Sequence, residues 1–403
     1  MMNGEKVHVY GYRWIILILF MLLNICSQIL WISYATVTLE ATTYYNVSEF
    51  EILFLSTIFM IVYIPVTFIT NWFINRFGFK IGVGFGALLN GVFGFLRFLV
   101  GPNYLLILFF SIMIAISQPF FLNTVTLLSA NWFPESERTT ATGLSVISQL
   151  LGIALGMVLT PILVIVFSFE IMLFIYGIFS LIIGIIFIIF ARDKPPIAPS
   201  IKLTEENVIV KGSLKRLIFN KLFWILIIIF LVGLGAFNMV TTYIELIVAP
   251  RGLTAIDAGN LGGIMLIGGI VGSVLMSILS DKLRKRIILI KISLLIAFVA
   301  FLAISLANNA IMLYIFGFLL GFGLLSVGPV VLEYAVDITV PVPEATSNGM
   351  LMMVGAVGGI IFILGFEGFT TPSGDYLPAL IVLSILSLVS FILSFFLKDA
   401  KRG

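Results

Sequence analysis

Long runs of apolar residues alternate with short polar segments along the whole chain. A helix that spans about 30 Å of hydrocarbon needs about 20 apolar residues, because each residue adds about 1.5 Å. The runs are continuously apolar, whereas the strands of a membrane β-barrel alternate between apolar and polar positions. The pattern therefore predicts twelve membrane-spanning helices, at residues 13–36, 50–72, 80–100, 104–129, 140–166, 169–191, 220–248, 258–280, 287–306, 310–337, 346–367 and 376–397.

Composition agrees with this pattern and excludes several classes of protein. Hydrophobic residues make up 61% and charged residues 10% of the 403 positions, whereas soluble domains are about 25% charged. The net charge of +3 provides no basic face for nucleic acid. The single cysteine, Cys26, and the single histidine, His8, exclude a disulfide framework and a metal centre of His and Cys ligands. We expect a multi-pass protein of the plasma (cell inner) membrane that needs no cofactor.

The distribution of basic residues predicts the orientation, since Lys and Arg concentrate in cytoplasmic loops. With both termini in the cytoplasm, only Arg97 and Arg251 of the 22 Lys and Arg residues fall on the outer side. The longest polar stretch, residues 192–219, has the prolines and mixed charges of a linker. It divides the chain into a six-helix bundle at residues 1–191 and a second one at residues 220–403.

Two short basic loops lie six helices apart. The first contains Asn75, Arg76, Gly78 and Lys80, and the second contains Asp281, Lys282 and Arg284. Ordinary positive-inside charge explains the basic residues but not their matching positions. Both loops resemble the G-x-L-x-D-R-x-G-R-R signature of the major facilitator superfamily, although Asn75 replaces the usual Asp. The resemblance implies an all-α fold of two six-helix bundles around a midplane cavity, which is exposed to each side in turn.

Further stretches resemble a narrower family, that of the feline leukaemia virus subgroup C receptors and their prokaryotic relatives. They are Leu30-Trp31-Ile32-Ser33-Tyr34 in the first helix, Tyr63-Ile64-Pro65 in the second, Ser148-Gln149-Leu150-Leu151-Gly152 in the fifth and Leu332-Glu333-Tyr334-Ala335-Val336-Asp337 in the tenth.

This resemblance implies a substrate class and four positions in its binding site. Members are linked to choline and ethanolamine uptake and some to haem export. The tryptophan that contacts the quaternary ammonium falls on Trp31, and a glutamine of the fifth helix falls on Gln149. A tyrosine of the seventh helix and a glutamine of the eleventh are replaced by Asn238 and Ala356. The smaller aromatic cage places choline itself in doubt, but not transport.

Polar side chains within the spans are the candidates for lining the cavity, because they are costly in lipid and face the bundle interior. Trp31 has an alternative role in the interfacial aromatic belt, and each amide has an alternative role in holding two helices together. Gly233 and Gly235 precede Asn238 and would allow a bend there. The candidates are Asn24, Gln28 and Trp31 on one face of the first helix, Gln118 and Asn123 in the fourth, Gln149 in the fifth, and Asn238 and Thr242 in the seventh.

The spans of the first half of the chain contain no Asp or Glu in their interiors, so the candidate acidic residues lie in the second half. Glu245 lies near the outer end of the seventh helix, either as a cation-attracting residue at the outer mouth or as a proton-coupling carboxylate. Glu333 and Asp337 lie toward the cytoplasmic end of the tenth helix. We expect those two to pair with the basic cytoplasmic loops and to govern closure of that side.

The leading hypothesis is a facilitator or weakly coupled carrier of a small cationic or zwitterionic solute. A Trp face contributes about 0.5–2 kcal/mol to binding an ammonium group. The alternatives are a proton-coupled exporter of drugs, metabolites or haem and, in a different class, a receptor or sensor that transports nothing. Sequence motifs of enzymes and of ATP-driven pumps are absent. We expect the small-molecule substrate and the lipid bilayer as partners, and a monomer.

Overall fold

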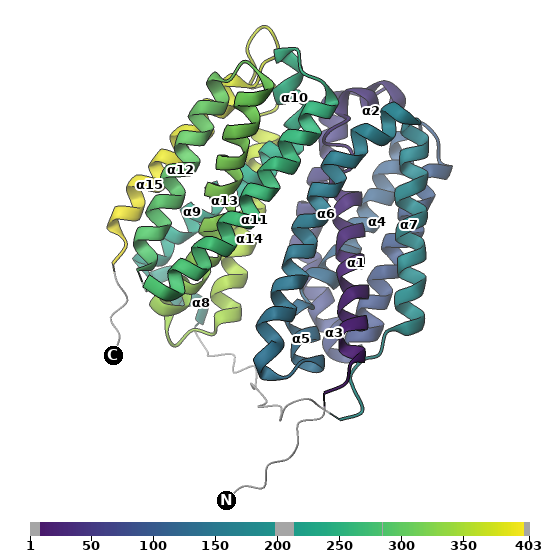
Figure 1. Ribbon diagram of the computed structural model, residues 1–403, viewed down its shortest axis with the longest axis vertical. Coiled ribbons are helices and arrows are strands. Elements are labelled where there is room, and N and C mark those ends of the chain that lie inside the picture. The colour runs from purple at the N-terminus through teal and green to yellow at the C-terminus, as the bar shows by residue number, and fades with distance from the viewer. Residues whose placement is uncertain (1–8, 198–212, 284, 399–403) are drawn as a thin grey trace, which may run out of the picture. The chain divides into compact units, whose positions relative to one another are not determined.

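A computed structural model describes residues 9–197, 213–283 and 285–398 of the chain. Expectations that involve Lys6, His8, Arg284, Lys401 or Arg402 lie outside these residues. Every regular element within the described ranges is a helix (Figure 1).

Among the described residues of the first half of the chain, there are seven α-helices and one 3-10 turn. They are α1 (Tyr12–Ile32), α2 (Thr38–Tyr45), α3 (Glu49–Leu99), α4 (Tyr104–Leu122), α5 (Val125–Trp132), η1 (Glu135–Glu137), α6 (Arg138–Val166) and α7 (Phe169–Phe190).

The part of the second half that the structure describes contains eight α-helices and two 3-10 turns. They are α8 (Ser213–Phe219), α9 (Lys221–Thr242), α10 (Ile244–Val248), η2 (Ala249–Arg251), α11 (Ala255–Leu283), α12 (Arg286–Leu306), α13 (Ala310–Thr339), α14 (Glu344–Gly365), α15 (Leu377–Leu393) and η3 (Ser394–Phe396).

Eleven helical stretches among the described residues are long and apolar enough to cross a membrane. One of them is α3, whose 51 residues would extend about 76 Å, more than twice the hydrocarbon thickness. The backbone of Gly78 leaves the helical conformation, with φ 87° and ψ 175°. The two helices predicted at 50–72 and 80–100 therefore meet at this residue without an intervening loop. The twelve-span topology with cytoplasmic termini stays a prediction.

The chain divides into two compact units. The first contains the chain up to Ser33, then Glu40–Gly156, then the chain from Ile162 to the linker. The second contains Tyr34–Leu39, Met157–Pro161 and the chain from α8 onward. Two short pieces of the first half of the sequence thus cluster with the second unit.

The predicted linker at 192–219 is not a loop throughout. Residues 198–212 lie outside the described residues, but Ser213–Phe219 form α8. The reason is packing: Leu217 of α8 is fully buried in the hydrophobic core of the second unit.

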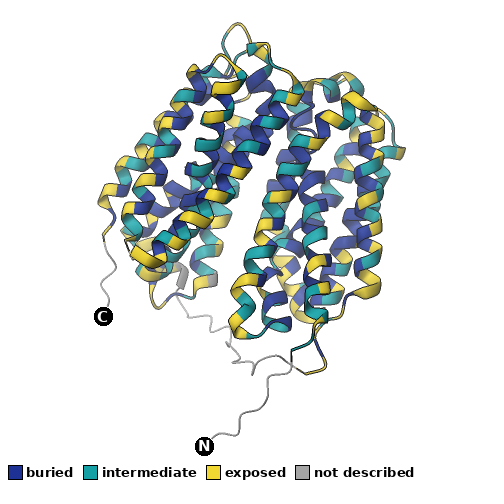
Figure 2. Ribbon diagram, in the orientation of Figure 1, coloured by how far each residue is buried: buried dark blue, intermediate teal, exposed yellow. Residues whose placement is uncertain are grey.

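Each unit has its own hydrophobic core, and apolar residues also cover the outer surface. The core of the first unit includes Ile16 and Phe20 of α1 together with Phe79 of α3. The core of the second includes Phe223 of α9 with Val331 of α13. Figure 2 shows buried positions along the interior of the bundles and exposed ones along their outer sides. Many of those exposed positions are large apolar residues, as expected for a surface that contacts lipid.

Glycine residues bring helix backbones into contact within each unit. In the first unit, a Cβ placed on Gly177 of α7 would lie 2.6 Å from the carbonyl oxygen of Gly94 in α3. In the second, a Cβ on Gly321 of α13 would lie within 2 Å of the carbonyl oxygen of Met265 in α11. Such contacts are typical of membrane helices, which approach closely where residues are small.

Candidate functional site

The polar face predicted on α1 is buried. Asn24, Gln28 and Trp31 are 1%, 5% and 6% exposed. The Asn24 Nδ2 group donates to the carbonyl oxygen of Phe20 at 3.1 Å, whereas its Oδ1 atom has no hydrogen-bond partner among the described residues. A buried amide oxygen without a partner is uncommon in proteins, so this atom is available to a ligand or a water molecule.

Trp31 is held by α3. Its indole N–H donates to the carbonyl oxygen of Ser56 at 3.1 Å, and the Ser56 hydroxyl donates to the Trp31 carbonyl oxygen at 3.3 Å. The polar atom of the indole is therefore occupied by the protein. What remains for a ligand is the face of the ring, whose negative quadrupole attracts cations.

Close packing of α1 on α6 sets the height of Gln149. A Cβ on Gly152 would lie 2.8 Å from Cα of Ile25, and a Cβ on Gly156 would lie 3.3 Å from Cα of Ile29. Because four residues along α6 match four residues along α1, the two helices run parallel in this register. Gln149, which is half-buried, is then level with Leu22, about 3 Å along the axis from Asn24 and about 13 Å from Trp31.

The amides predicted on α4 lie beside a break in the helix. Gln118 is 7% exposed, and α4 ends at Leu122, three residues after Pro119. Asn123 follows as the C-cap residue, and its Oδ1 atom accepts the hydroxyl of Tyr63 from α3 at 3.4 Å. Sequence reasoning did not propose Tyr63 as a site residue, although a polar aromatic residue two positions before Pro65 was a usable signal.

The polar face predicted on the seventh helix is divided between two helices. α9 remains helical through Gly233 and Gly235 and ends at Thr242, and α10 begins at Ile244. The predicted bend is therefore misplaced. A Cβ on Gly235 would lie 2.7 Å from the carbonyl carbon of Gly358 in α14, so this glycine serves helix packing instead.

Glu245 is buried in the second unit. Its side chain is 2% exposed, and its Oε2 atom accepts the backbone N–H of Leu39 at 3.1 Å. Leu39 lies in the first turn of α2, where N–H groups have no helical partner and a negative charge is favourable. On α9, Asn238 is 8% exposed and Thr242 fully buried, and the Thr242 hydroxyl has no partner among the described residues.

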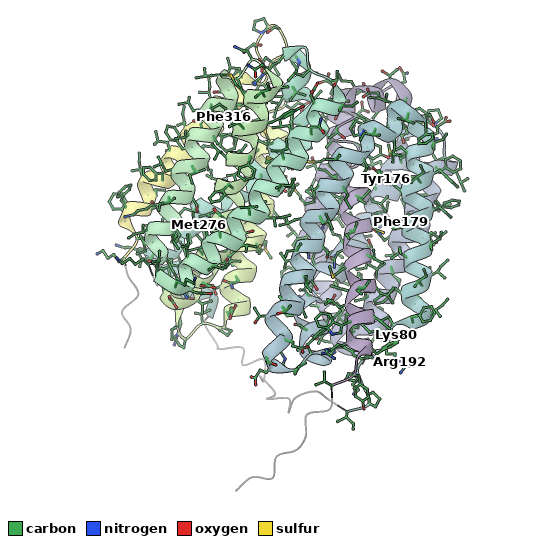
Figure 3. All side chains as sticks on the ribbon, in the orientation of Figure 1. Lys80, Tyr176, Phe179, Arg192, Met276 and Phe316 are labelled. Carbon is green, nitrogen blue, oxygen red and sulfur yellow. The ribbon has the colours of Figure 1, made fainter. Side chains whose placement is uncertain are left out.

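The residues of the two repeated basic loops behave differently in the two units. In the first unit, Asn75 and Arg76 are exposed, and the Arg76 guanidinium lies over the rings of Trp72 and Phe77 at 5.7 and 5.6 Å. The carboxylate of Asp193, which sequence reasoning missed, accepts the backbone N–H of Lys80 at 3.1 Å. Lys80 and Arg192 lie at the same end of this unit (Figure 3).

In the second unit, Arg286 binds both acidic residues of α13. Its guanidinium pairs with Glu333 at 3.1 Å and with Asp337. Asp281 and Lys282 are exposed, and Arg284 lies outside the described residues. Sequence reasoning expected Glu333 and Asp337 to pair with the basic loops but did not single out Arg286 as their partner.

Of the two arginines placed on the outer side by sequence, Arg97 is buried, and Arg251 is half-buried with a side chain that is 5% exposed. Arg97 is 1% exposed. Arg251 donates to the carbonyl oxygens of Ile304 and Ala307 at 2.7 and 2.9 Å and pairs with Asp375 at 3.7 Å. Burial lowers the pKa of Arg251, and the nearby Asp375 raises it in part. The guanidinium remains charged at physiological pH.

The described residues contain no group of three or more His, Cys, Asp or Glu that would hold a metal ion. Their site chemistry consists of one aromatic ring, several amides and hydroxyls, and one buried carboxylate, which suits binding rather than bond-making.

A family model described as Major Facilitator Superfamily matches residues 16–363 and 251–403 of the chain. The chain belongs to the major facilitator superfamily. It is a membrane transporter with an all-helical fold and not an enzyme.

Its relatives include named carriers. It is 28% identical to solute carrier family 49 member A3 of Xenopus tropicalis over 92% of this chain and 81% of that one. It is 27% identical to the choline/ethanolamine transporter flvcr2a of Danio rerio, over 99% and 89% of the two chains. The human choline/ethanolamine transporter FLVCR2 is 26% identical over 97% and 78%. The resemblance to the feline leukaemia virus receptor family is thus confirmed.

The fold is also similar to a solved structure. The inward-facing, unoccupied bacterial homologue of the human lysosomal transporter Spinster has a TM-score of 0.76. That match covers 98% of this chain and 100% of the other, at 15% identity. At this identity the likeness concerns the fold alone.

Proposed function

We propose that the chain is a facilitator or weakly coupled carrier of a small organic cation or zwitterion of the choline and ethanolamine class. It acts as a monomer in the plasma membrane, by alternating access, with twelve spans and both termini in the cytoplasm. The observation that carries the proposal is the buried indole of Trp31, whose N–H is already bonded to Ser56. Only the ring face is left to bind a ligand, and that face binds ammonium groups.

Buried amides on the same unit support this proposal. Asn24, Gln28 and Gln118 are buried, and Gln149 is half-buried about 3 Å from the height of Asn24. Neutral amides bind a hydroxyl or ammonium group without the fixed charge that an anionic substrate would require. The free Oδ1 of Asn24 and free Nδ2 of Asn123 are candidates to bind the polar end of the solute.

The names of the relatives support the same class of substrate, since two of them are called choline/ethanolamine transporters. Asn238 and Ala356 depart from the residues that the resemblance implies at those positions. We therefore propose a class of solute and not one compound, and we use choline to represent that class in the experiments.

A second candidate rests on Glu245. A carboxylate that is 2% exposed in a membrane helix is the kind of group that exchanges protons during transport. This observation favours proton-coupled export of drugs, metabolites or haem as the alternative. For both the facilitator and the proton-coupled exporter, we propose that the ion pairs of Arg286 with Glu333 and Asp337 govern closure of the cytoplasmic side.

The test is uptake of radiolabelled choline into proteoliposomes of the purified protein, with and without an imposed pH gradient. We expect saturable uptake that does not depend on the gradient. Flux that requires the gradient would instead support the proton-coupled alternative and a coupling role for Glu245. Saturable binding of choline without flux would support a receptor. Neither binding nor flux by folded protein would contradict the choline-class proposal.

A further inference from the structure

Arg97 places a guanidinium group inside the first unit. It lies in the last turn of α3 and is 1% exposed. Its Nη1 group donates to the carbonyl oxygen of Leu30 at 2.9 Å, and its Nη2 group donates to the hydroxyl of Ser111 in α4 at 2.8 Å. One side chain thus joins the end of α1 to α3 and α4.

The end of α1 is a favourable position for this charge. The last carbonyl groups of a helix have no partner within it, and the negative end of the helix dipole attracts a cation. Hydrogen bonds from a charged donor are also stronger than neutral ones. The next carbonyl group, that of Trp31, accepts the hydroxyl of Ser56. Two successive carbonyls of the final turn are therefore bonded to α3.

This turn is where α1 would otherwise be least constrained. α1 ends at Ile32, and the chain from Tyr34 to Leu39 clusters with the second unit. Trp31 is thus within three residues of the point where the chain leaves the first unit. Helix ends open locally more easily than helix centres, so a ring that must bind a ligand there needs external support.

We propose that Arg97 is a positioning residue for substrate binding: it fixes the last turn of α1 and thereby holds the ring of Trp31 in place. This inference rests on the proposed function, in which Trp31 contacts the solute. Arg97 does not itself contact the solute. Its guanidinium donates to the carbonyl of Leu30 and to the hydroxyl of Ser111.

The experiment measures the equilibrium dissociation constant of choline for purified wild-type protein and for Arg97→Met. We expect Kd to rise about tenfold, which corresponds to about 1.4 kcal/mol. The matched control is Asn90→Ala. Asn90 lies seven residues earlier on α3, is fully buried, and donates to Ser180 of α7 at 2.8 Å. That variant removes a buried polar contact of the same unit that does not involve α1, so its Kd is expected to stay within about twofold of wild type.

A double-mutant cycle with Trp31→Ala separates positioning from general destabilisation. If Arg97 acts through Trp31, Arg97→Met has no further effect on Kd once the ring is gone. If Arg97→Met raises the Kd of choline equally in the wild-type and the Trp31→Ala backgrounds, the proposal is overturned. It is also overturned if Asn90→Ala raises Kd as much as Arg97→Met does. If Arg97→Met does not fold, the cycle is run with Arg97→Lys, because lysine cannot bridge Leu30 and Ser111 together. An unchanged Kd in that folded variant would also overturn it.

A different result would contradict the proposed function. If Trp31→Ala leaves the Kd of choline unchanged, Trp31 is not the binding surface and the proposed site is wrong. If Trp31→Ala weakens binding while Arg97→Met does not, the site stands and only the positioning role of Arg97 is overturned.

Discussion

At the scale of single residues, the first unit provides neutral groups and the second a carboxylate. The indole of Trp31 and the amides around it are buried in the first unit. Glu245 is the corresponding group of the second unit, and it bonds to the N–H of Leu39 at the start of α2. Its charge therefore has a structural partner in addition to any role toward the solute.

Replacing Glu245 by Gln tests which role its charge has. Glutamine keeps an oxygen that accepts the Leu39 N–H, so we expect the fold to be retained. A unit charge acting through a medium of effective dielectric constant near 20 changes binding by on the order of 1 kcal/mol, so KM for choline should rise about fivefold. Initial rates of uptake over a range of choline concentrations measure this. Loss of gradient-driven uptake with unchanged KM would instead identify Glu245 as a proton carrier.

Sequence reasoning identified the polar residues of the site but not what each one contacts. The spacing of Asn24, Gln28 and Trp31 placed them on one buried helix face. The contacts of Trp31 with Ser56 and of Asn123 with Tyr63 join positions at least 25 residues apart. No local pattern encodes such pairings. Arg97 was placed on the outer side from its charge alone, because the carbonyl of Leu30 that binds it depends on how α1 packs on α3.

At the scale of helices, glycine positions determine which pairs approach closely. Gly152 and Gly156 bring α6 onto α1, and Gly235 and Gly358 bring α9 and α14 together. Each close pair joins the first long helix of one half of the chain to a later helix of the same half. The sequence analysis interpreted Gly235 as a position that allows a bend, whereas the structure places it in a contact between two helices.

A pair of glycine variants tests this distinction. Gly235→Ala would place a Cβ 2.7 Å from the Gly358 backbone, whereas the space around Gly233 is open to 4 Å. We expect Gly235→Ala to destabilise the protein by about 1–3 kcal/mol, as overpacking does. Gly233→Ala, two residues earlier in the same buried helix, should leave stability unchanged. Thermal unfolding in detergent measures both, and equal melting temperatures would contradict a packing role for Gly235.

Helix ends were less predictable than helix centres. The apolar runs predicted the positions of the long helices, because hydropathy decides which segments enter lipid. The run predicted at 104–129 is divided at Asn123 into α4 and α5, and the run at 220–248 is divided at Tyr243 into α9 and α10. Neither break carries a Gly at its centre. Polar residues lie at both, Asn123 and Thr124 at the first and Thr241 and Thr242 before the second. Each run is nevertheless apolar on both sides of its break, so hydropathy averaged over a span does not locate the break.

At the scale of the whole molecule, the chain is a superfamily transporter with chemically unlike halves. Ion pairs of Arg286 with Glu333 and Asp337 tie the C-terminal end of α13 to α12 in the second unit. At the matching loop of the first unit, Asn75 is exposed, and Asp193 binds the backbone of Lys80 instead. The repeated loop motif therefore uses different contacts in the two units.

The central claim is that the buried ring of Trp31 recognises the positive charge of a small solute. The most direct test compares the equilibrium binding of choline with that of its neutral isostere, 3,3-dimethylbutan-1-ol, to the purified protein. The two ligands share size and hydroxyl group, and they differ in charge. We predict saturable binding of choline and about tenfold weaker binding of the isostere, as a desolvated cation–π contact requires. Equal affinities for the two ligands would contradict the account.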